Sequence, residues 1–225
     1  MPALDFVACR LQASREIETA GRDKKRLLST LQRLAEQAEE QLAHAEENDA
    51  SLIACRAGCG SCCVVNVSVL IPEGLAIAAL LRRLPVAEQE LVTARLDWLW
   101  RAVRGLTDDE RLSLGQSCAF LDVSGHCLVY PVRPLLCRSV TSTSAESCRQ
   151  ARTAHYFDEQ SPVLMNLNQQ QLYEAVYLGV SDGLERSGID ARGVKLTGLV
   201  RHLLQKPAAG AALLSGKRLD WHDLA

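Results

Sequence analysis

The chain has 225 residues, of which 48% are hydrophobic and 23% charged, and its formal net charge is −2. These values are typical of one soluble globular domain, or of a compact domain with helical extensions. The near balance of 25 basic and 27 acidic side chains excludes a strong general attraction to polyanions. We therefore expect no nucleic-acid partner, and the sequence indicates no particular protein partner.

No stretch has the features of a targeting or membrane segment. The first apolar run, ALDFVA at residues 3–8, is short and is followed by charged residues, so it does not resemble a signal peptide. No run approaches the ~18 apolar residues that a membrane span needs. We expect a cytoplasmic protein. In a reducing compartment, clustered cysteines are metal ligands or reactive thiols rather than disulfides.

The first part of the chain has the pattern of an amphipathic helix. From about Leu11 to His44, apolar residues recur at helical spacing among many charged ones. We expect this helix to be interrupted near Gly21, since glycine weakens a helix interior. The polar residues 46–51 follow and are typical of a linker. Residues 1–50 are therefore predicted to form a helical extension.

A dense group of cysteines follows the linker. Residues 55–63 read CRAGCGSCC and place four thiols within nine residues. Gly58 and Gly60 allow the backbone to fold tightly, so that sulfur atoms a few residues apart can point at one centre. The pattern predicts a metal-binding knuckle whose ligands are Cys55, Cys59, Cys62 and Cys63.

Helices are expected between this knuckle and the next cysteine. The β-branched run at residues 64–71 predicts a strand or a support under the metal loop. Pro72 opens a predicted helix, and a second helix is expected over Val86–Val103, with Trp98 packed in the core. Residues 106–116 are predicted to be a polar connection.

A second group of cysteines lies in residues 118–148. The segments 119–123 and 128–130 are predicted to be two very short strands joined by a turn. Cys118 and Cys127 would then lie at opposite ends of a small hairpin.

Two further cysteines complete this group. Residues 135–138 are predicted to form one helical turn that presents Cys137, and the Ser- and Thr-rich residues 139–147 are predicted to be a loop. Cys148 would then open another helical turn. The ninth cysteine, Cys9, stands apart and is expected to be a small buried hydrophobic residue.

The C-terminal part is predicted to be helical. Apolar spacing indicates helices over residues 168–187 and 194–205, followed by a partly apolar tail that docks on them. The expected fold class is mainly α, with a small irregular cysteine-rich region that contains short β-strands. We expect three parts: the extension 1–50, a metal-binding domain 51–158, and helices in 159–225 that pack on the same core.

The eight clustered cysteines have the chemistry of a thiolate metal site. Soft thiolates select zinc, copper(I) or iron–sulfur clusters, and four sulfurs suit one tetrahedral zinc or one cubane cluster. Because consecutive side chains tend to point apart, Cys62 and Cys63 are expected to serve two nearby centres, or to bridge within one polynuclear centre. Such crowding favours an iron–sulfur cluster over zinc by a small margin. We expect the ligand sets to mix the two groups, which would couple metal binding to folding.

Basic side chains lie near these cysteines in the sequence. Arg133 and Arg138 are predicted to bind the cofactor, since a guanidinium group can donate charge-assisted hydrogen bonds to a thiolate and lower its pKa. His126 and His155 are alternative nitrogen ligands. Thiol exchange without a metal is a further alternative, although neither group has the setting of a thioredoxin-like CxxC motif.

Two classes of function follow from these residues. In the first, the protein binds metal for structure or for metal handling, and sulfur fills every coordination position. In the alternative, it is an iron–sulfur-dependent metalloenzyme or redox protein that acts on an unknown substrate, with Arg133 or Arg138 orienting an anionic group. The sequence leaves open whether the protein is an enzyme.

The arrangement of the two groups resembles a known family. CRAGCGSCC at residues 55–63 and CAFLDVSGHCLVYPVRPLLCR at residues 118–138 are similar to the motifs of the YkgJ-type cysteine-cluster proteins, and CRQAR at residues 148–152 extends the match. That family is described as carrying a zinc- or iron-chelating CxxxCxxCC domain. The resemblance implies that the cysteines of both groups are metal-site residues.

Two enzyme activities of proteins with similar motifs are not expected here. A related cysteine motif occurs in flagellin lysine methylases, which supports an iron–sulfur cluster in part of the group, but this chain has no GxGxxG nucleotide-binding fingerprint. The CxxxCxxC spacing is also that of radical S-adenosylmethionine enzymes. Ser61, however, stands where those enzymes usually have an aromatic residue, and the sequence lacks the alternating strands and helices of their barrel.

Overall fold

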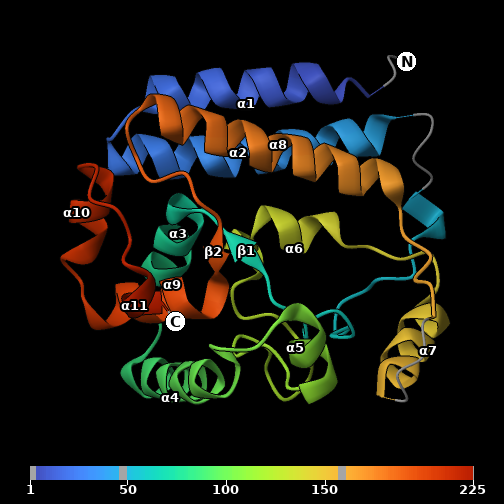
Figure 1. Cartoon of the computed structure of the whole chain (residues 1–225). Helices are drawn as coiled ribbons and strands as arrows, with labels where there is room; N and C mark the ends of the chain where they lie inside the picture. Colours follow the sequence, from blue (N-terminus) through green and yellow to red (C-terminus); the bar gives the residue numbers. More distant parts are fainter. Residues whose placement is uncertain (1–3, 46–49, 157–160, 225) are drawn as a thin grey trace.

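The protein is mainly α-helical, as its sequence predicts (Figure 1). The computed structural model describes residues 4–45, 50–156 and 161–224. The α-helices are α1 (Phe6–Ala20), α2 (Lys24–His44), α3 (Ile71–Leu81), α4 (Val86–Val103), α5 (Asp108–Leu114), α6 (Leu135–Ser139), α7 (Ala145–Tyr156), α8 (Leu167–Arg186), α9 (Leu196–Gln205), α10 (Ala209–Leu214) and α11 (Trp221–Leu224). Two short strands, β1 (Ser68–Val69) and β2 (Val194–Lys195), form an antiparallel sheet. Within the described residues, no helix combines the length and hydropathy needed to cross a membrane.

The helices surround a shared hydrophobic core. Figure 1 shows α1, α2 and α8 side by side, with α3, α9 and the small sheet next to them and α4 and α5 on the opposite side. Buried side chains of all of these helices except α5 form one cluster with Phe120 and Leu135 from the cysteine-rich segment. Residues from all three expected parts thus contribute to the core, while the division into domains stays a prediction.

The N-terminal helix is interrupted at Gly21, as predicted. Gly21 has a φ of 60°, which is in the left-handed region that favours glycine. Asp23 then caps α2 with its side chain. The first helix begins at Phe6 rather than near residue 11, because Asp5 caps it there.

Helices α1 and α8 pack unusually closely because two glycines of α8 face α1. A Cβ added to Gly183 would lie 2.6 Å from the carbonyl oxygen of Ser14, and a Cβ on Gly179 would collide with the carbonyl oxygen of Arg10. An ion pair of 2.7 Å between Arg10 and Asp182 borders this contact. The glycines therefore let the two backbones touch.

The small sheet ties the segment after the knuckle to the C-terminal part. Val69 lies opposite Val194, and both are buried. The strand predicted over residues 64–71 is thus only two residues long. The helix predicted over 194–205 begins two residues later, because its first two residues form β2.

The prediction of a plain polar connection over residues 106–116 is wrong, because helix α5 lies there. The backbone amide of Thr107 donates a 2.8 Å hydrogen bond to the carboxylate of Glu110, and the amide of Glu110 donates one of 3.3 Å to the Thr107 hydroxyl. Gly115, with a φ of 63°, ends the helix. This reciprocal capping box is a sequence signal for the start of a helix, and it favours a helix in spite of the polar composition of the segment.

Helix α7 also begins earlier than predicted. The loop predicted over residues 139–147 ends at Ser144, whose hydroxyl accepts a 3.1 Å hydrogen bond from the amide of Ser147. Serine at this position caps the first turn of a helix. Cys148 therefore lies inside the helix rather than at its start.

Helix α4 has the predicted bounds, but Trp98 does not anchor the core. Its side chain is 57% exposed, whereas Leu96, Leu99 and Val103 are buried. The buried positions recur every three or four residues, and Trp98 falls between them on the helix surface. The predicted packing role of Trp98 is therefore wrong.

Gly183→Ala is expected to lower the free energy of unfolding by about 1–3 kcal/mol, since the added methyl overpacks the α1–α8 contact. Chemical denaturation measures this change. Gly105→Ala is the matched control, because a Cβ at Gly105 meets nothing within 4 Å. Equal stabilities of the two variants would contradict the close packing of α1 on α8.

Candidate metal centre

The knuckle consists of two consecutive tight turns. The amide of Cys59 donates a 2.9 Å hydrogen bond to the carbonyl oxygen of Arg56, and the amide of Cys63 donates one of 3.0 Å to that of Gly60. Gly58 has a φ of 83°, which a residue with a Cβ rarely adopts. The backbone thus turns twice within the cysteine-rich loop, in agreement with the predicted knuckle.

The knuckle packs directly on the second cysteine group. The amide of Cys118 donates a 2.7 Å hydrogen bond to the carbonyl oxygen of Cys63. Gly125 lies so near the knuckle that an added Cβ would be 2.7 Å from the carbonyl oxygen of Gly58. The two cysteine groups therefore meet in space, as predicted.

The predicted hairpin is smaller than expected. Leu121 and Cys127 form an isolated antiparallel bridge. The carboxylate of Asp122 accepts hydrogen bonds of 2.8 Å from the amides of Ser124 and His126. Because this side-chain turn uses the residues between the two predicted strands, regular strand pairing is reduced to the single bridge.

A buried carboxylate orients the helix that carries Cys137. Glu73 is 2% exposed and accepts hydrogen bonds from the amides of Leu70 (2.7 Å) and Leu135 (2.8 Å). It therefore joins the first turns of α3 and α6, where helical amides lack partners. Burial raises the pKa of Glu73 to about 7, against the opposing effects of these hydrogen bonds and of Arg138. Sequence reasoning misses this role, because the contact joins residues far apart in the chain.

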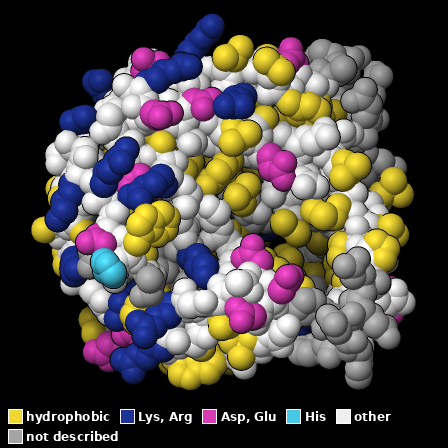
Figure 2. Space-filling model, viewed as in Figure 1, with side chains coloured by type: hydrophobic (Ala, Val, Ile, Leu, Met, Phe, Trp, Pro, Cys, Tyr) yellow, Lys and Arg dark blue, Asp and Glu magenta, His cyan; other side chains and the backbone are white. Residues whose placement is uncertain are grey.

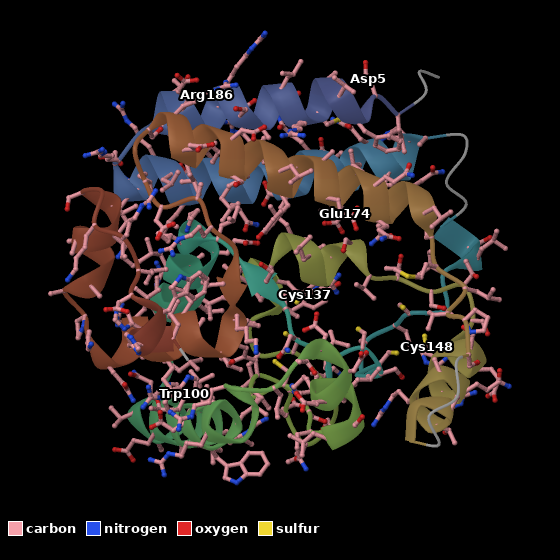
Figure 3. All side chains as sticks on the ribbon, viewed as in Figure 1. Asp5, Trp100, Cys137, Cys148, Glu174 and Arg186 are labelled. Carbon is pink, nitrogen blue, oxygen red and sulfur yellow. The ribbon has the colours of Figure 1, made fainter. Side chains whose placement is uncertain are left out.

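The loop before α7 connects the first and last clustered cysteines. The amide of Ala54 donates a 2.9 Å hydrogen bond to the carbonyl oxygen of Ser142, and the amide of Ser142 donates one of 3.3 Å to Sγ of Cys55. Figure 3 shows sulfur atoms between α5, α6 and α7, with Cys137 on α6 and Cys148 on α7. The loop thus holds the knuckle and α7 together.

The clustered thiols fall into two electrostatic neighbourhoods. The Cys55 set, defined by the thiols whose charges act on Cys55, consists of Cys55, Cys59, Cys62 and Cys148. The Cys63 set consists of Cys63, Cys118, Cys127 and Cys137, and it contains the thiols other than Cys62 whose charges act on Cys63 or Cys118. Each set combines both sequence groups. Cys62 also acts on Cys63 and Cys137, so it lies where the two sets meet.

The thiols of Cys62 and Cys63, the vicinal pair, differ in acidity. A hydrogen bond from the Cys63 thiol, together with the charge of Arg133, lowers the pKa of Cys62 to about 6. The same hydrogen bond and burial raise the pKa of Cys63. Burial raises the pKa of Cys118 to about 11. Burial also raises the pKa values of Cys55, Cys127 and Cys137.

The two arginines predicted from the sequence have different surroundings. Arg133 has a buried Nε without a hydrogen-bond partner, and its guanidinium lies 5.4 Å from the ring centre of Tyr130. Burial raises the pKa of Cys127, and the charge of Arg133 offsets part of that rise. Arg138 instead donates a 2.9 Å hydrogen bond to the carbonyl oxygen of Arg133 and forms a 3.6 Å ion pair with Glu39 of α2. Cofactor binding by Arg133 and Arg138 stays a prediction.

Sequence reasoning missed a third arginine at the site. Arg111 on α5 is only 2% exposed, and its buried Nη1 has no hydrogen-bond partner. Burial lowers the pKa of Arg111, while its electrostatic neighbour Cys118 opposes that shift. The capping box at Thr107 was available in the sequence as a signal for the helix, but it does not reveal which way Arg111 points.

The residues present fit a metal held by thiolates. Sulfur donors suit zinc and iron–sulfur centres, and the unpartnered N–H groups of Arg111 and Arg133 match the negative charge that several thiolates carry. In the part of the chain that the structure describes, no three Cys, His, Asp or Glu side chains already stand as a finished metal site.

The other candidate ligands have other contacts or cannot be placed. His126 is exposed, with its Nδ1 3.8 Å from a carboxylate oxygen of Asp122. The side chain of His155 lies outside the described residues. Cys9 on α1 donates a 3.1 Å hydrogen bond to Gln41 of α2 and is only partly buried.

Gly125→Ala is expected to separate the knuckle from the hairpin and to lose most of the bound metal. A Cβ at this position would collide with the backbone of Gly58 and would be strained at a φ of 81°. Gly21→Ala is the matched control, since it also has a positive φ but its added Cβ would make only an ordinary contact, 3.8 Å from the carbonyl oxygen of Glu18, outside the cysteine-rich segment. Metal per chain, measured on anaerobically purified protein, should fall only for Gly125→Ala. Equal metal contents would contradict a role for this contact.

A comparison with known families identifies the cysteine-rich segment. Residues 54–161 match the family model CxxCxxCC, described as "Putative zinc- or iron-chelating domain". The chain has no match among curated proteins or solved structures. The matched segment contains both cysteine groups and helix α7. Residues 54–161 of the chain are therefore similar to the cysteine-cluster family of zinc- or iron-chelating domains.

Proposed function

We propose that the protein holds two metal centres, one in the Cys55 set and one in the Cys63 set, and that iron–sulfur clusters occupy them in preference to zinc. The observation that carries this proposal is the backbone hydrogen bond from the amide of Cys118 to the carbonyl oxygen of Cys63, which joins the two cysteine groups. The division into two sets of four matches the number of sulfur ligands that one cluster or one zinc ion takes.

The vicinal pair supports two centres that lie close together. Cys62 belongs to the Cys55 set and Cys63 to the Cys63 set, although a single peptide bond separates them. A hydrogen bond also links Cys62 to Cys63, so the two centres that we propose lie next to each other. Because they share the backbone of the knuckle, binding at one centre orders the other.

Metal binding in this arrangement also stabilises the fold. Each set joins segments that are far apart in the chain, so coordination adds to folding free energy. The thiols reach coordination geometry by side-chain rotation, with the backbone already in place. We propose a cytoplasmic location, where thiols stay reduced. The primary role is then metal binding, for structure or for metal handling.

A redox protein or metalloenzyme is the second candidate function. The solvent exposure of Cys62 favours it, because an exposed ligand is the one that a substrate or an electron-transfer partner reaches first. This function requires iron, since zinc has no redox chemistry. Identification of the metal therefore discriminates between the two candidates.

Anaerobically purified wild-type protein is expected to be brown, with an absorption band near ~400 nm and with iron and acid-labile sulfide in elemental analysis. Colourless protein that contains zinc would exclude iron–sulfur clusters and leave a zinc-binding function. Protein without bound metal, purified with its thiols reduced, would contradict both candidates.

Cys59→Ala and Cys137→Ala are each expected to lose bound metal and soluble yield together, because each removes one ligand from a different set. Cys9→Ala is the matched control and should keep the wild-type metal content, since Cys9 contacts Gln41 instead. Metal content per chain measures both effects. Unchanged metal in the Cys59 and Cys137 variants would refute ligation, and a clear drop in the Cys9 variant would refute the choice of ligands.

A further inference from the structure

Helix α5 packs on the protein through a charged side chain instead of an apolar face. Arg111 is its one buried residue, and all residues of this helix are described. Asp108, Asp109 and Glu110 are exposed, and Leu114 is 39% exposed. A surface helix usually docks through an apolar stripe. The position of α5 therefore depends on what Arg111 contacts.

Arg111 lacks a carboxylate partner among the residues that the structure describes, and its buried Nη1 makes no hydrogen bond. Burial of an unpaired guanidinium is unfavourable. Its electrostatic neighbour is Cys118, a member of the Cys63 set. The anion that suits this place is a thiolate sulfur, because Cys118 is the acidic group whose charge acts on Arg111.

We propose that Arg111 is a positioning residue that docks α5 on the thiolates of the loaded metal centre, so that metal loss releases this helix. The inference rests on the proposed function. When a thiol coordinates a metal ion it gives its proton to solvent, and its sulfur gains negative charge. That charge is the partner that the Arg111 guanidinium otherwise lacks.

Because α5 contacts other segments, its release would change the protein surface outside the metal site. The helix contacts α7, which carries Cys148, and Asp108 accepts a 2.9 Å hydrogen bond from Asn66 in the segment after the knuckle. Figure 2 shows Asp and Glu side chains over α5 at the edge of a hollow in this face. Release of α5 moves this acidic edge, so the surface responds to the state of the metal.

Trypsin cleavage after Arg111 tests the release in the wild-type chain. Arg111 is buried in the structure, and with metal bound it should resist cleavage. After metal removal by a chelator, cleavage after Arg111 should become at least about tenfold faster, as expected for a locally opened segment. Cleavage after Arg26, an exposed residue of α2, should change little and serves as the control.

Two results of this experiment would overturn the inference. One is an unchanged rate at Arg111 on metal removal. The other is a parallel increase at Arg26, because the metal would then hold the whole fold and not α5 in particular. If reduced wild-type protein binds no metal, the proposed function fails together with this inference. If it binds metal but Arg111 stays protected without it, only this inference fails.

Variants separate positioning from simple packing. Arg111→Met keeps the long side chain but removes its charge, and should weaken Zn²⁺ binding about tenfold in competition with a chelator, as loss of an outer-shell partner does. Arg111→Lys should recover part of the affinity. Arg101→Met, on the exposed side of α4, should bind Zn²⁺ like the wild type.

The stability of metal-free Arg111→Met distinguishes a positioning role of Arg111 from a packing role. Without metal, Arg111→Met should be at least as stable as the wild type, because it removes an unpaired buried charge. A less stable metal-free variant with unchanged Zn²⁺ affinity would show that Arg111 only fills space, and would overturn the proposal.

Discussion

The close approach of two backbone turns, at Gly58 and Gly125, is the constraint on which the cysteine site depends. Glycine at position 125 removes the Cβ atom that would collide with the knuckle, and Gly58 provides the positive φ of 83° that the knuckle turn needs. The 2.7 Å hydrogen bond from Cys118 to Cys63 then fixes their relative position. Because the contact is made by backbone atoms, the cysteine side chains remain available for chemistry. The surrounding helices hold this junction in place, with Glu73 tying α3 to α6.

Charge is the second constraint, and it connects the site to a function. Burial favours the neutral form of most of the clustered thiols, and it lowers the pKa of Arg111. Arg111 and Arg133 each have a buried N–H group without a hydrogen-bond partner. While the thiols are neutral, these N–H groups lack a negatively charged acceptor. Under the proposed function, metal coordination converts the thiols to thiolates and satisfies both. Under this proposal, the cysteine-cluster domain is arranged for the metal-bound state, and loss of the metal releases α5.

The parts of the fold that strong local signals specify could be predicted from the sequence. Helix α4 has the expected bounds between Pro85 and Gly105, whereas α5 was missed, because a capping box at Thr107 outweighs a polar composition. In the site, cysteine spacing suffices to choose the candidate ligands. Arg111 and Glu73 could not be found in this way, since their roles depend on contacts between segments that only the packed fold brings together.

X-ray absorption at the metal edge of anaerobically purified protein is the most direct test of a centre held by cysteine thiolates. Two centres built from the Cys55 and Cys63 sets predict a first coordination shell of sulfur alone, with metal–sulfur distances of about 2.3 Å. A first shell dominated by nitrogen or oxygen would contradict that assignment. It would show that side chains other than the clustered cysteines hold the metal.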